Sequence, residues 1–232
     1  MSSVFWNESS QTWKRVGFFG LLGIVFVTSL VGGAALFIAQ SRVSPQAIVS
    51  SVTRTPELLD RAWSLPVAAT FNRRLVPQSN ISRCGPASVA NAYRSLGDTA
   101  NTEGKVLEGT GRCWTSFCIP GLTLDELADV ARAHTHREIT LLRDLSEEQF
   151  REHLRRSNDP GRRYIVNFTR KQIFGAGGGH FSPIGCYLEA QDLVFILDVN
   201  ADYQPWLVAS KRLFDAVDTF DGNQKRGLLL IE

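Results

Sequence analysis

The feature that most constrains this chain is a long apolar run near its N-terminus. From Val16 to Ala39 there are 24 residues without one ionisable side chain. As a helix this run would be about 36 Å long at roughly 1.5 Å per residue, which exceeds the roughly 30 Å hydrocarbon core of a bilayer. The sequence therefore predicts a membrane-spanning helix over residues 16–39, preceded by a flank of residues 1–15.

The charges beside the run predict its orientation. Lys14 and Arg15 precede it and only Arg42 follows closely, so the positive-inside bias favours a cytoplasmic N-terminus. We therefore expect a single-pass protein of the inner (cell) membrane whose main domain is periplasmic or extracytoplasmic. A cleaved signal peptide is the alternative, because Gly33 and Ala35 form a small-x-small site. The run continues past this site, which favours the anchor, and a buried core helix is a third, minor alternative.

The composition argues for one globular domain after this segment. The chain is 44% hydrophobic and 21% charged, with 25 basic and 23 acidic residues. This balance argues against a disordered chain and against a nucleic-acid partner. Four cysteines are too few for a disulfide scaffold. We expect residues 40–55, rich in Ser, Thr, Val and Pro, to be a linker, and residues 56–232 to form the domain.

The order of the expected elements indicates an α+β fold. Helices are expected at 84–96, 123–134, from 146, and around 211–217, and strands at 164–168, 180–188, 193–199 and 227–231. Two of the helix starts carry a capping-box pattern, at Thr123 and Ser146. Because helices mostly precede strands, the pattern predicts an N-terminal helical part and a C-terminal antiparallel sheet.

Cys84 is the first candidate for chemistry. Pro86 marks a first helical turn, so the thiol would lie where free backbone N–H groups favour an anion and promote the thiolate. For Cys84 alone, a small buried cysteine is an equally ordinary interpretation. Gln78, six residues earlier, is a candidate to stabilise an oxyanion together with the Cys84 backbone N–H. The alternative interpretation of Gln78 is an ordinary solvated glutamine in a loop.

His180 and Asp198 are the next candidates. If the hairpin turns near residue 189 or 190, antiparallel partners have numbers that sum to about 378, and these two residues would be cross-strand neighbours. A carboxylate beside an imidazole fixes its tautomer and steadies the imidazolium, as a base that activates a thiol requires. Taken singly, His180 could be a core histidine and Asp198 a turn cap.

Around these residues the chain resembles the phytochelatin synthases, which are glutathione γ-glutamylcysteinyltransferases of the papain-like cysteine-peptidase clan. The matching stretches, in family order over about residues 64–232, are 76–78, 84–88, 121–128, 166–171, 178–183, 195–199 and 225–227. The resemblance implies a papain-like fold in which Cys84, His180 and Asp198 are catalytic and Gln78 serves the oxyanion hole.

The resemblance also implies a substrate and a reaction. Asn167 and Arg226 match family positions that contact the γ-glutamylcysteine moiety. Glutathione would be cleaved through an acyl-enzyme on Cys84 with release of glycine, and the acyl group would pass to water or to a second glutathione. The second outcome makes phytochelatins, which links the family to heavy-metal detoxification. This chain ends after its last expected strand, as the short bacterial members do, in which hydrolysis tends to dominate.

The expected partners follow from the same resemblance. Glutathione is the substrate, the membrane is contacted through residues 16–39, and a homodimer is left open. The chemistry requires no cofactor; a heavy-metal ion (Cd, Zn or Cu) would act as an activator or arrive as a thiolate complex of the substrate. No metal ligands are assigned. Cys113 and Cys118 could form a disulfide, bind a soft metal as a pair, or be two separate thiols.

Two other functions stay open. A bacteriocin-processing cysteine peptidase of the C39 type shares a Gln six residues before a Cys-Gly and a later His-Phe, as in Gln78, Cys84 and His180 here. A non-catalytic anchored module that binds thiol peptides or metal is the other. The stretch from Asn167 to Lys171 and the Arg226-Gly pair fit the synthases better than the peptidases.

Overall fold

The computed structural model describes residues 42–113, 118 and 121–232, and the account below concerns this part of the chain. Residues 43–232 form one compact unit. The expected membrane segment, residues 16–39, and the flank before it lie outside the described residues. None of the helices in the described part is long and apolar enough to cross a membrane.

A six-stranded antiparallel sheet runs through the unit, in the order β1-β8-β2-β3-β4-β5. Its strands are β1 (Ile139–Leu142), β2 (Arg163–Thr169), β3 (Gly179–Leu188), β4 (Leu193–Ile196), β5 (Trp206–Ala209) and β8 (Leu228–Ile231). A separate hairpin pairs β6 (Phe220–Asp221) with β7 (Gln224–Lys225). The expected α+β arrangement with an antiparallel sheet is confirmed.

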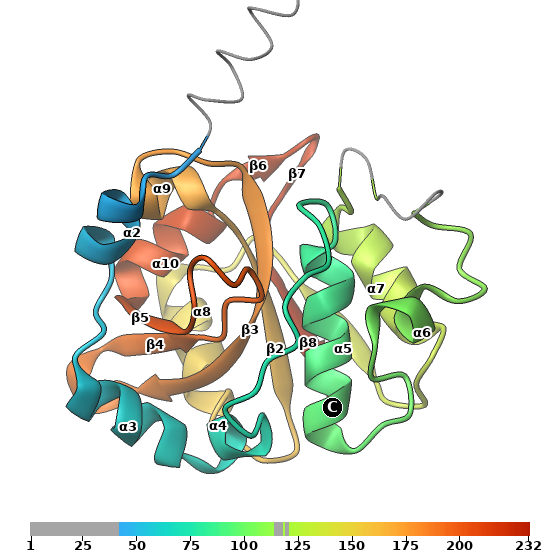
Figure 1. Cartoon of the computed structure of the whole chain (residues 1–232), viewed down its shortest axis with the longest axis horizontal. Coiled ribbons are helices and arrows are strands. Elements are labelled where there is room, and N and C mark those ends of the chain that lie inside the picture. The colour runs from blue at the N-terminus through green and yellow to red at the C-terminus, as the bar shows by residue number, and fades with distance from the viewer. Residues whose placement is uncertain (1–41, 114–117, 119–120) are drawn as a thin grey trace, which may run out of the picture. The chain divides into compact units, whose positions relative to one another are not determined.

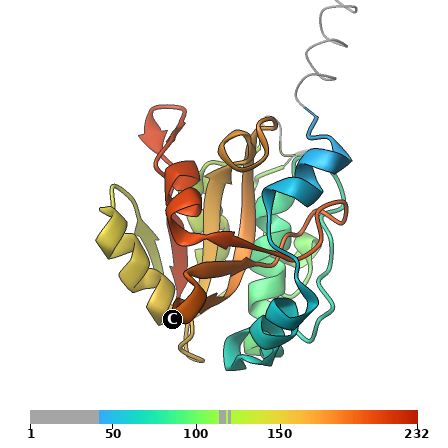
Figure 2. The same ribbon diagram turned by 90° about the vertical axis from the view of Figure 1, so that its left-hand side faces the viewer.

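Helices cover both faces of the sheet (Figures 1 and 2). The described helices are α2 (Pro45–Ser51), α3 (Pro56–Ser64), α4 (Pro66–Thr70), α5 (Cys84–Leu96), α6 (Glu103–Leu107), α7 (Leu124–Arg132), α8 (Glu147–Arg156), α9 (Arg170–Phe174) and α10 (Ser210–Val217). Alternate side chains of β2 serve the two faces: Ile165 packs in the cluster with α5 and α7, and Val166 in the cluster with α8 and α10. This double cover explains why β2 and β3 are buried almost throughout.

Local sequence signals set the helix that carries Cys84. α5 ends where Gly97 adopts a left-handed conformation at φ 79°, which a glycine does without strain. At the other end, a Cβ on Gly85 would lie 2.9 Å from Cδ1 of Leu127. A glycine at 85 therefore allows α5 to pack closely against α7, and this contact fixes the position of Cys84 over the sheet.

The expected hairpin of β3 and β4 forms, but its predicted register is wrong. Partner numbers sum to 380 at Ile184 with Ile196 and to 381 at Leu188 with Leu193. The difference arises because the turn is a 3-10 helix over 189–191 and because a bulge lies between Ile184 and Cys186. Because β4 ends at Ile196, opposite Ile184, no strand pairing joins His180 to Asp198. On the other edge of β3, His180 pairs with Phe168 of β2.

Residues 43–54 pack onto the unit, and we call them the N-terminal strap. Ile48 of α2 is buried in the main core and Val43 packs against it. Thr53 exchanges two backbone hydrogen bonds with Leu207 of β5, at 2.8 and 3.0 Å. Residues 40–55 were expected to form a linker, but from Val43 onward they pack onto the unit. The reason is that Ile48 of α2 is an apolar side chain that is buried in the core.

Candidate active site

Cys84 is the first residue of α5 and is partly exposed. The loop before it is held from α6, because Glu103 accepts hydrogen bonds from the Ser79 backbone N at 2.9 Å and from Arg83 at 3.2 Å. Arg83 is the N-cap and supplies no side-chain cap to the helix. The first-turn N–H groups of α5 are thus not occupied by a capping side chain, which suits an anion at this end.

The structure brings His180 and Asp198 together by another route than the predicted pairing. Asp198 lies two residues beyond β4, where its Oδ1 accepts a hydrogen bond from the Asn200 backbone N at 2.9 Å. From this bend Oδ1 lies 3.0 Å from Nε2 of His180, and both side chains are buried. The His180 imidazole also acts on the Cys84 thiol, whose pKa it lowers. Since Nε2 faces the carboxylate, Nδ1 is the ring nitrogen left for the thiol.

Two further side chains hold the Asp198 carboxylate. Arg170, at the start of α9, donates from Nη2 to Oδ1 at 3.0 Å, and Trp206 of β5 donates from Nε1 to Oδ2 at 3.0 Å. The guanidinium of Arg170 in turn lies 3.4 Å from the centre of the Tyr203 ring. Asp198 is therefore a fully hydrogen-bonded buried anion with a fixed orientation.

These contacts shift the ionisation of all three groups. Burial raises the pKa of Cys84, but His180, the Phe181 backbone N–H and Arg170 outweigh it, so the pKa of the thiol is lowered. Burial and Arg170 lower the pKa of His180, but Asp198 and Cys84 raise it by a larger amount, so the pKa of His180 is raised overall. Although burial opposes it, Arg170 and His180 hold the pKa of Asp198 well below its usual range. This pattern favours a thiolate–imidazolium pair.

Gln78 reaches the same region through its backbone. Its N–H donates to the carbonyl of Val199, the residue after Asp198, at 2.8 Å. Its side-chain Nε2 donates to the Asn80 carbonyl at 2.9 Å, and its Oε1 is buried without a partner. The structure thus places Gln78 between the loop of Cys84 and the loop of Asp198, with its amide turned into its own loop.

The buried side chains of Asn167 and Arg226 form one cluster with the partly exposed Asp221. Arg226 donates from Nη1 to Oδ1 of Asn167 at 2.9 Å and pairs through Nη2 with Asp221 at 3.1 Å. Asn167 donates from Nδ2 to Asp221 at 3.1 Å. Burial lowers the pKa of Arg226, and Asp221 and the more weakly acting Cys84 only partly offset it. The cluster therefore lies within electrostatic range of the thiol.

A glycine makes room for this cluster beside His180. A Cβ on Gly179 would lie 3.0 Å from Cζ and Nη2 of Arg226 and closer still to Nη1. The guanidinium thus rests on the backbone of the residue immediately before His180. Because a glycine has no Cβ, Gly179 lets the Arg226 guanidinium approach the backbone this closely.

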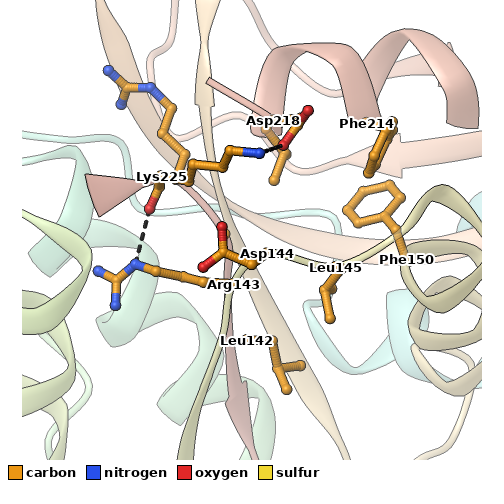
Figure 3. Close-up of a pocket in the computed structure, with 11 residues that line it drawn as sticks. Leu142, Arg143, Asp144, Leu145, Phe150, Phe214, Asp218 and Lys225 are labelled. Carbon is orange, nitrogen blue, oxygen red and sulfur yellow. Dashed lines mark hydrogen bonds and ion pairs between the residues drawn. The ribbon is translucent and has the colours of Figure 1, made fainter. Parts of the chain in front are cut away.

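Two hollows border the cluster. One is lined by Asn167, Asp221 and Gly222 together with charged side chains of Asp125, Arg143 and Lys225. The other is shown in Figure 3, and its lining includes Arg143, Lys225 and Asp218. Nε of Arg143 donates a hydrogen bond to the Lys225 carbonyl at 2.9 Å, and the Lys225 side chain forms an ion pair with Asp218. Cys84 is not among the described residues that line either hollow.

The structure resolves the alternatives for Cys113 and Cys118 in favour of a disulfide. The Cys118 backbone N donates to Oγ of Ser82 at 2.9 Å, so the disulfide borders the loop before Cys84. The fourth cysteine, Cys186, lies in the core, where burial raises the pKa of its thiol to about 12. Within the described ranges no group of three or more His, Cys, Asp or Glu side chains could hold a metal ion.

Reasoning from sequence missed three residues that hold the site: Arg170, Trp206 and Asp221. Arg170 gave no signal beyond its place in a resembling stretch, because a single arginine at a strand end is usually solvated. Trp206 lay in a short apolar run that was not recognised as β5. Asp221 precedes Gly222, and an Asp-Gly pair between β-type residues is a turn signal that could have located the β6–β7 hairpin.

Comparison with known proteins places this geometry in a family. A model of the phytochelatin synthase family matches residues 38–228. Glutathione gamma-glutamylcysteinyltransferase from Schizosaccharomyces pombe is 26% identical over 176 residues, which are 69% of this chain and 42% of that relative. Glutathione gamma-glutamylcysteinyltransferase 3 from Lotus japonicus is 33% identical over 118 residues, which are 49% of this chain and 25% of that relative. The chain thus spans less than half the length of these relatives.

The fold has its own parallel among solved structures. A C39-like peptidase from Bacillus anthracis superposes with a TM-score of 0.50 at 13% identity, over 70% of this chain and 95% of the peptidase. This likeness concerns the fold, which is papain-like. Because the family model matches well over half of the sequence, the chain belongs to the phytochelatin synthase family.

Proposed function

We propose that this chain is a glutathione γ-glutamylcysteinyltransferase that also hydrolyses glutathione, acting through an acyl-enzyme on Cys84. The observation that carries the proposal is the convergence of the Cys84 thiol, the His180 imidazole and the Asp198 carboxylate, in which His180 lowers the pKa of the thiol and lies 3.0 Å from Asp198. Beside them lies the cluster of Asn167 and Arg226 with the residue that sequence reasoning missed, Asp221. A thiol, a base and a carboxylate in this order form the arrangement that acyl transfer requires.

The proposed reaction begins with the thiolate of Cys84. It attacks the carbonyl carbon of the Cys-Gly bond of glutathione, and the carbonyl electron pair moves to oxygen. The Cys84 backbone N–H stabilises the oxyanion, and Gln78 joins it once its side-chain amide turns toward the thiol. When the tetrahedral intermediate collapses, the C–N bond breaks and His180 gives its proton to the nitrogen of the departing glycine.

The second half of the reaction regenerates the thiolate. His180, now neutral, takes a proton from water or from the α-amine of a second glutathione, which attacks the thioester carbonyl. The C–S bond breaks, and the product is γ-glutamylcysteine after attack by water or a chain longer by one γ-Glu-Cys unit after attack by glutathione. Asp198 stays ionised throughout, because its pKa lies well below the usual range.

The cluster beside the thiol suits the γ-glutamyl end of glutathione. That end carries an α-carboxylate and an α-ammonium on one carbon. Arg226 offers a guanidinium and Asp221 a carboxylate 3.1 Å away, and the Asp221 side chain is 31% exposed. Asn167 fixes both of them from the buried side. A zwitterionic head group would exchange hydrogen bonds with this pair without leaving a buried charge unpaired.

The role of heavy metals belongs to the same proposal. A soft cation such as Cd would enter as the thiolate complex of glutathione, since thiolates are the ligands that soft cations prefer. In that case the metal changes the acceptor that attacks the thioester, and it does not change the first step, in which Cys84 is acylated. We propose that transfer increases relative to hydrolysis when Cd is added.

One experiment tests the proposal. The full chain is incubated with glutathione, with and without Cd, and the products are followed by mass. We expect release of glycine, with γ-glutamylcysteine or longer oligomers as the other product, and loss of release in Cys84→Ser. Cys186→Ser is the matched control, because it removes a thiol from the core away from the site. If glycine is not released, or if Cys84→Ser still releases it, the proposal is refuted; cleavage of an unrelated peptide instead would favour the C39-type peptidase function.

A further inference from the structure

Four large apolar side chains stay exposed in the described part of the chain. They are Val49 at 66%, Val76 at 36%, Ile81 at 88% and Phe220 at 68%. Single exposed apolar residues are ordinary on protein surfaces. Two of them stand next to site residues in the sequence: Ile81 lies three residues before Cys84, and Phe220 immediately precedes Asp221.

Three of these residues belong to elements at one end of the 43–232 unit. α2, which carries Val49, the loop that leads into α5, and the β6–β7 hairpin all lie at the upper end in Figure 1, and Figure 2 agrees for α2 and the hairpin. We call this the active-site end, because α5 begins there with Cys84. Val76 is excluded, since its backbone is bonded to Asn91 halfway along α5.

Few residues of the sequence separate the apolar run from the N-terminal strap. The run ends at Ala39, and Val43 is already packed against the core. Four residue steps of about 3.8 Å bridge at most about 15 Å. Val43 reaches the active-site end itself: a Cβ on Gly177, in the glycine loop before His180, would lie 3.1 Å from Cγ2 of Val43.

We propose that the active-site end docks onto a lipid bilayer, with Ile81, Phe220 and Val49 entering the headgroup region and residues 16–39 as the anchor. A 24-residue uncharged run is long enough to span a bilayer, and the four residue steps that join it to Val43 would limit how far the strap can move from the lipid. Apolar side chains at the rim then gain contact with acyl chains, as interfacial residues do. Glutathione, which is small and polar, enters from the side, along the aqueous interface. The proposal does not depend on the identity of the substrate.

The test uses the full chain with labelled Ile, Leu and Val methyl groups, reconstituted in nanodiscs of phosphatidylcholine and phosphatidylglycerol. A lipid with a gadolinium chelate on its headgroup broadens methyl signals near the bilayer surface. We expect loss of the Ile81 and Val49 signals while the Leu96 signal is retained. Leu96 is the internal control, because it ends α5 about 18 Å from Cys84 along the helix axis. Equal loss at Ile81 and Leu96, or loss at neither, overturns the proposal, as does failure of the chain to stay in the nanodisc.

A second chain separates docking from mere tethering. It carries a long Gly-Ser insertion between Arg42 and Val43, which frees the domain from its short connection. The Ile81 signal should still be lost in this chain, and it should return when Phe220→Asp and Val49→Asp are added. Val76→Asp in the same chain is the matched control and should leave the loss unchanged. If the insertion alone restores the Ile81 signal, there is no docking surface. Glycine release from glutathione, measured on the same samples, reports separately on the proposed function.

Discussion

Replacing Gly179 by alanine is the sharpest test of how the substrate cluster is built. The added methyl group would lie 3.0 Å from Cζ and Nη2 of Arg226, whereas carbon atoms in good contact lie roughly 3.5–4.0 Å apart. Gly179 has no left-handed conformation, so the backbone itself accepts alanine. The strand pairing of β3 holds the new methyl in place, and the guanidinium must therefore move by about 1 Å.

The expected loss follows from the bonds that such a movement breaks. Arg226 is held at 2.9 Å from Asn167 and at 3.1 Å from Asp221, and both contacts would pass the limit of a hydrogen bond. Hydrogen bonds to charged groups contribute about 1.5–3 kcal/mol. If the substrate loses the equivalent of one such bond to the displaced guanidinium, then at about 1.4 kcal/mol per tenfold kcat/KM for glutathione should fall by roughly 10- to 150-fold, mainly through KM.

The neighbouring glycine provides the control. A Cβ on Gly178 meets nothing within 4 Å, so Gly178→Ala should keep kcat/KM close to that of the unmodified chain. Both variants are assayed by glycine release over a range of glutathione concentrations, with thermal unfolding to show that they fold. Adding Arg226→Ala to Gly179→Ala should cost little more, since the same contact is already lost. Unchanged kinetics in Gly179→Ala, or an equal loss in Gly178→Ala, would refute the reasoning.

Three other predictions concern Asp198. Asp198→Asn should lower the rate of glycine release by a factor on the order of 10⁴. Because Asp198 raises the pKa of His180, the alkaline limb of the pH–rate profile should also move to lower pH in this variant. An alkaline limb that stays in place would contradict this prediction. The folded-state pKa of Asp198 is lowered, so its contribution to stability is present above the unfolded value of about 3.9 and is lost as the pH falls below it. Urea midpoints measured between pH 6 and pH 3 should accordingly fall more steeply for the unmodified chain than for Asp198→Asn, and parallel curves would count against the argument. Trp206→Phe should leave Oδ2 of Asp198 buried without its donor and lower the free energy of unfolding by about 1–3 kcal/mol, whereas a loss below about 0.5 kcal/mol would show that another donor takes its place.

Local signals in the sequence predicted much of the fold because they act over a few residues. The capping boxes at Thr123 and Ser146 form as expected, with each side chain bonded to the third helical residue and that residue bonded back. The end of α5 at Gly97 follows from the left-handed conformation that glycine favours. In the same way Pro86 in the first turn of α5 was enough to place Cys84 at a helix start.

Pairings between distant elements were harder to predict. The register of β3 and β4 depends on a bulge and a 3-10 turn that no short motif marks, yet His180 and Asp198 still meet because the bend at Asn200 returns the carboxylate to the imidazole. The roles of Arg170 and Asp221 depend on contacts across 28 and 54 residues of chain, with Asp198 and Asn167. Such contacts are set by the completed sheet and leave no periodic pattern.

The bridge between Thr53 and Leu207 has a practical consequence for protein production. β5 is the last strand of the sheet, and its four residues, Trp206–Ala209, are mostly apolar. Thr53 covers its free backbone with two hydrogen bonds. A recombinant fragment that begins at residue 56 would expose this edge and invite strand-to-strand aggregation. A soluble fragment should therefore begin no later than Val43, so that the sheet keeps its cover.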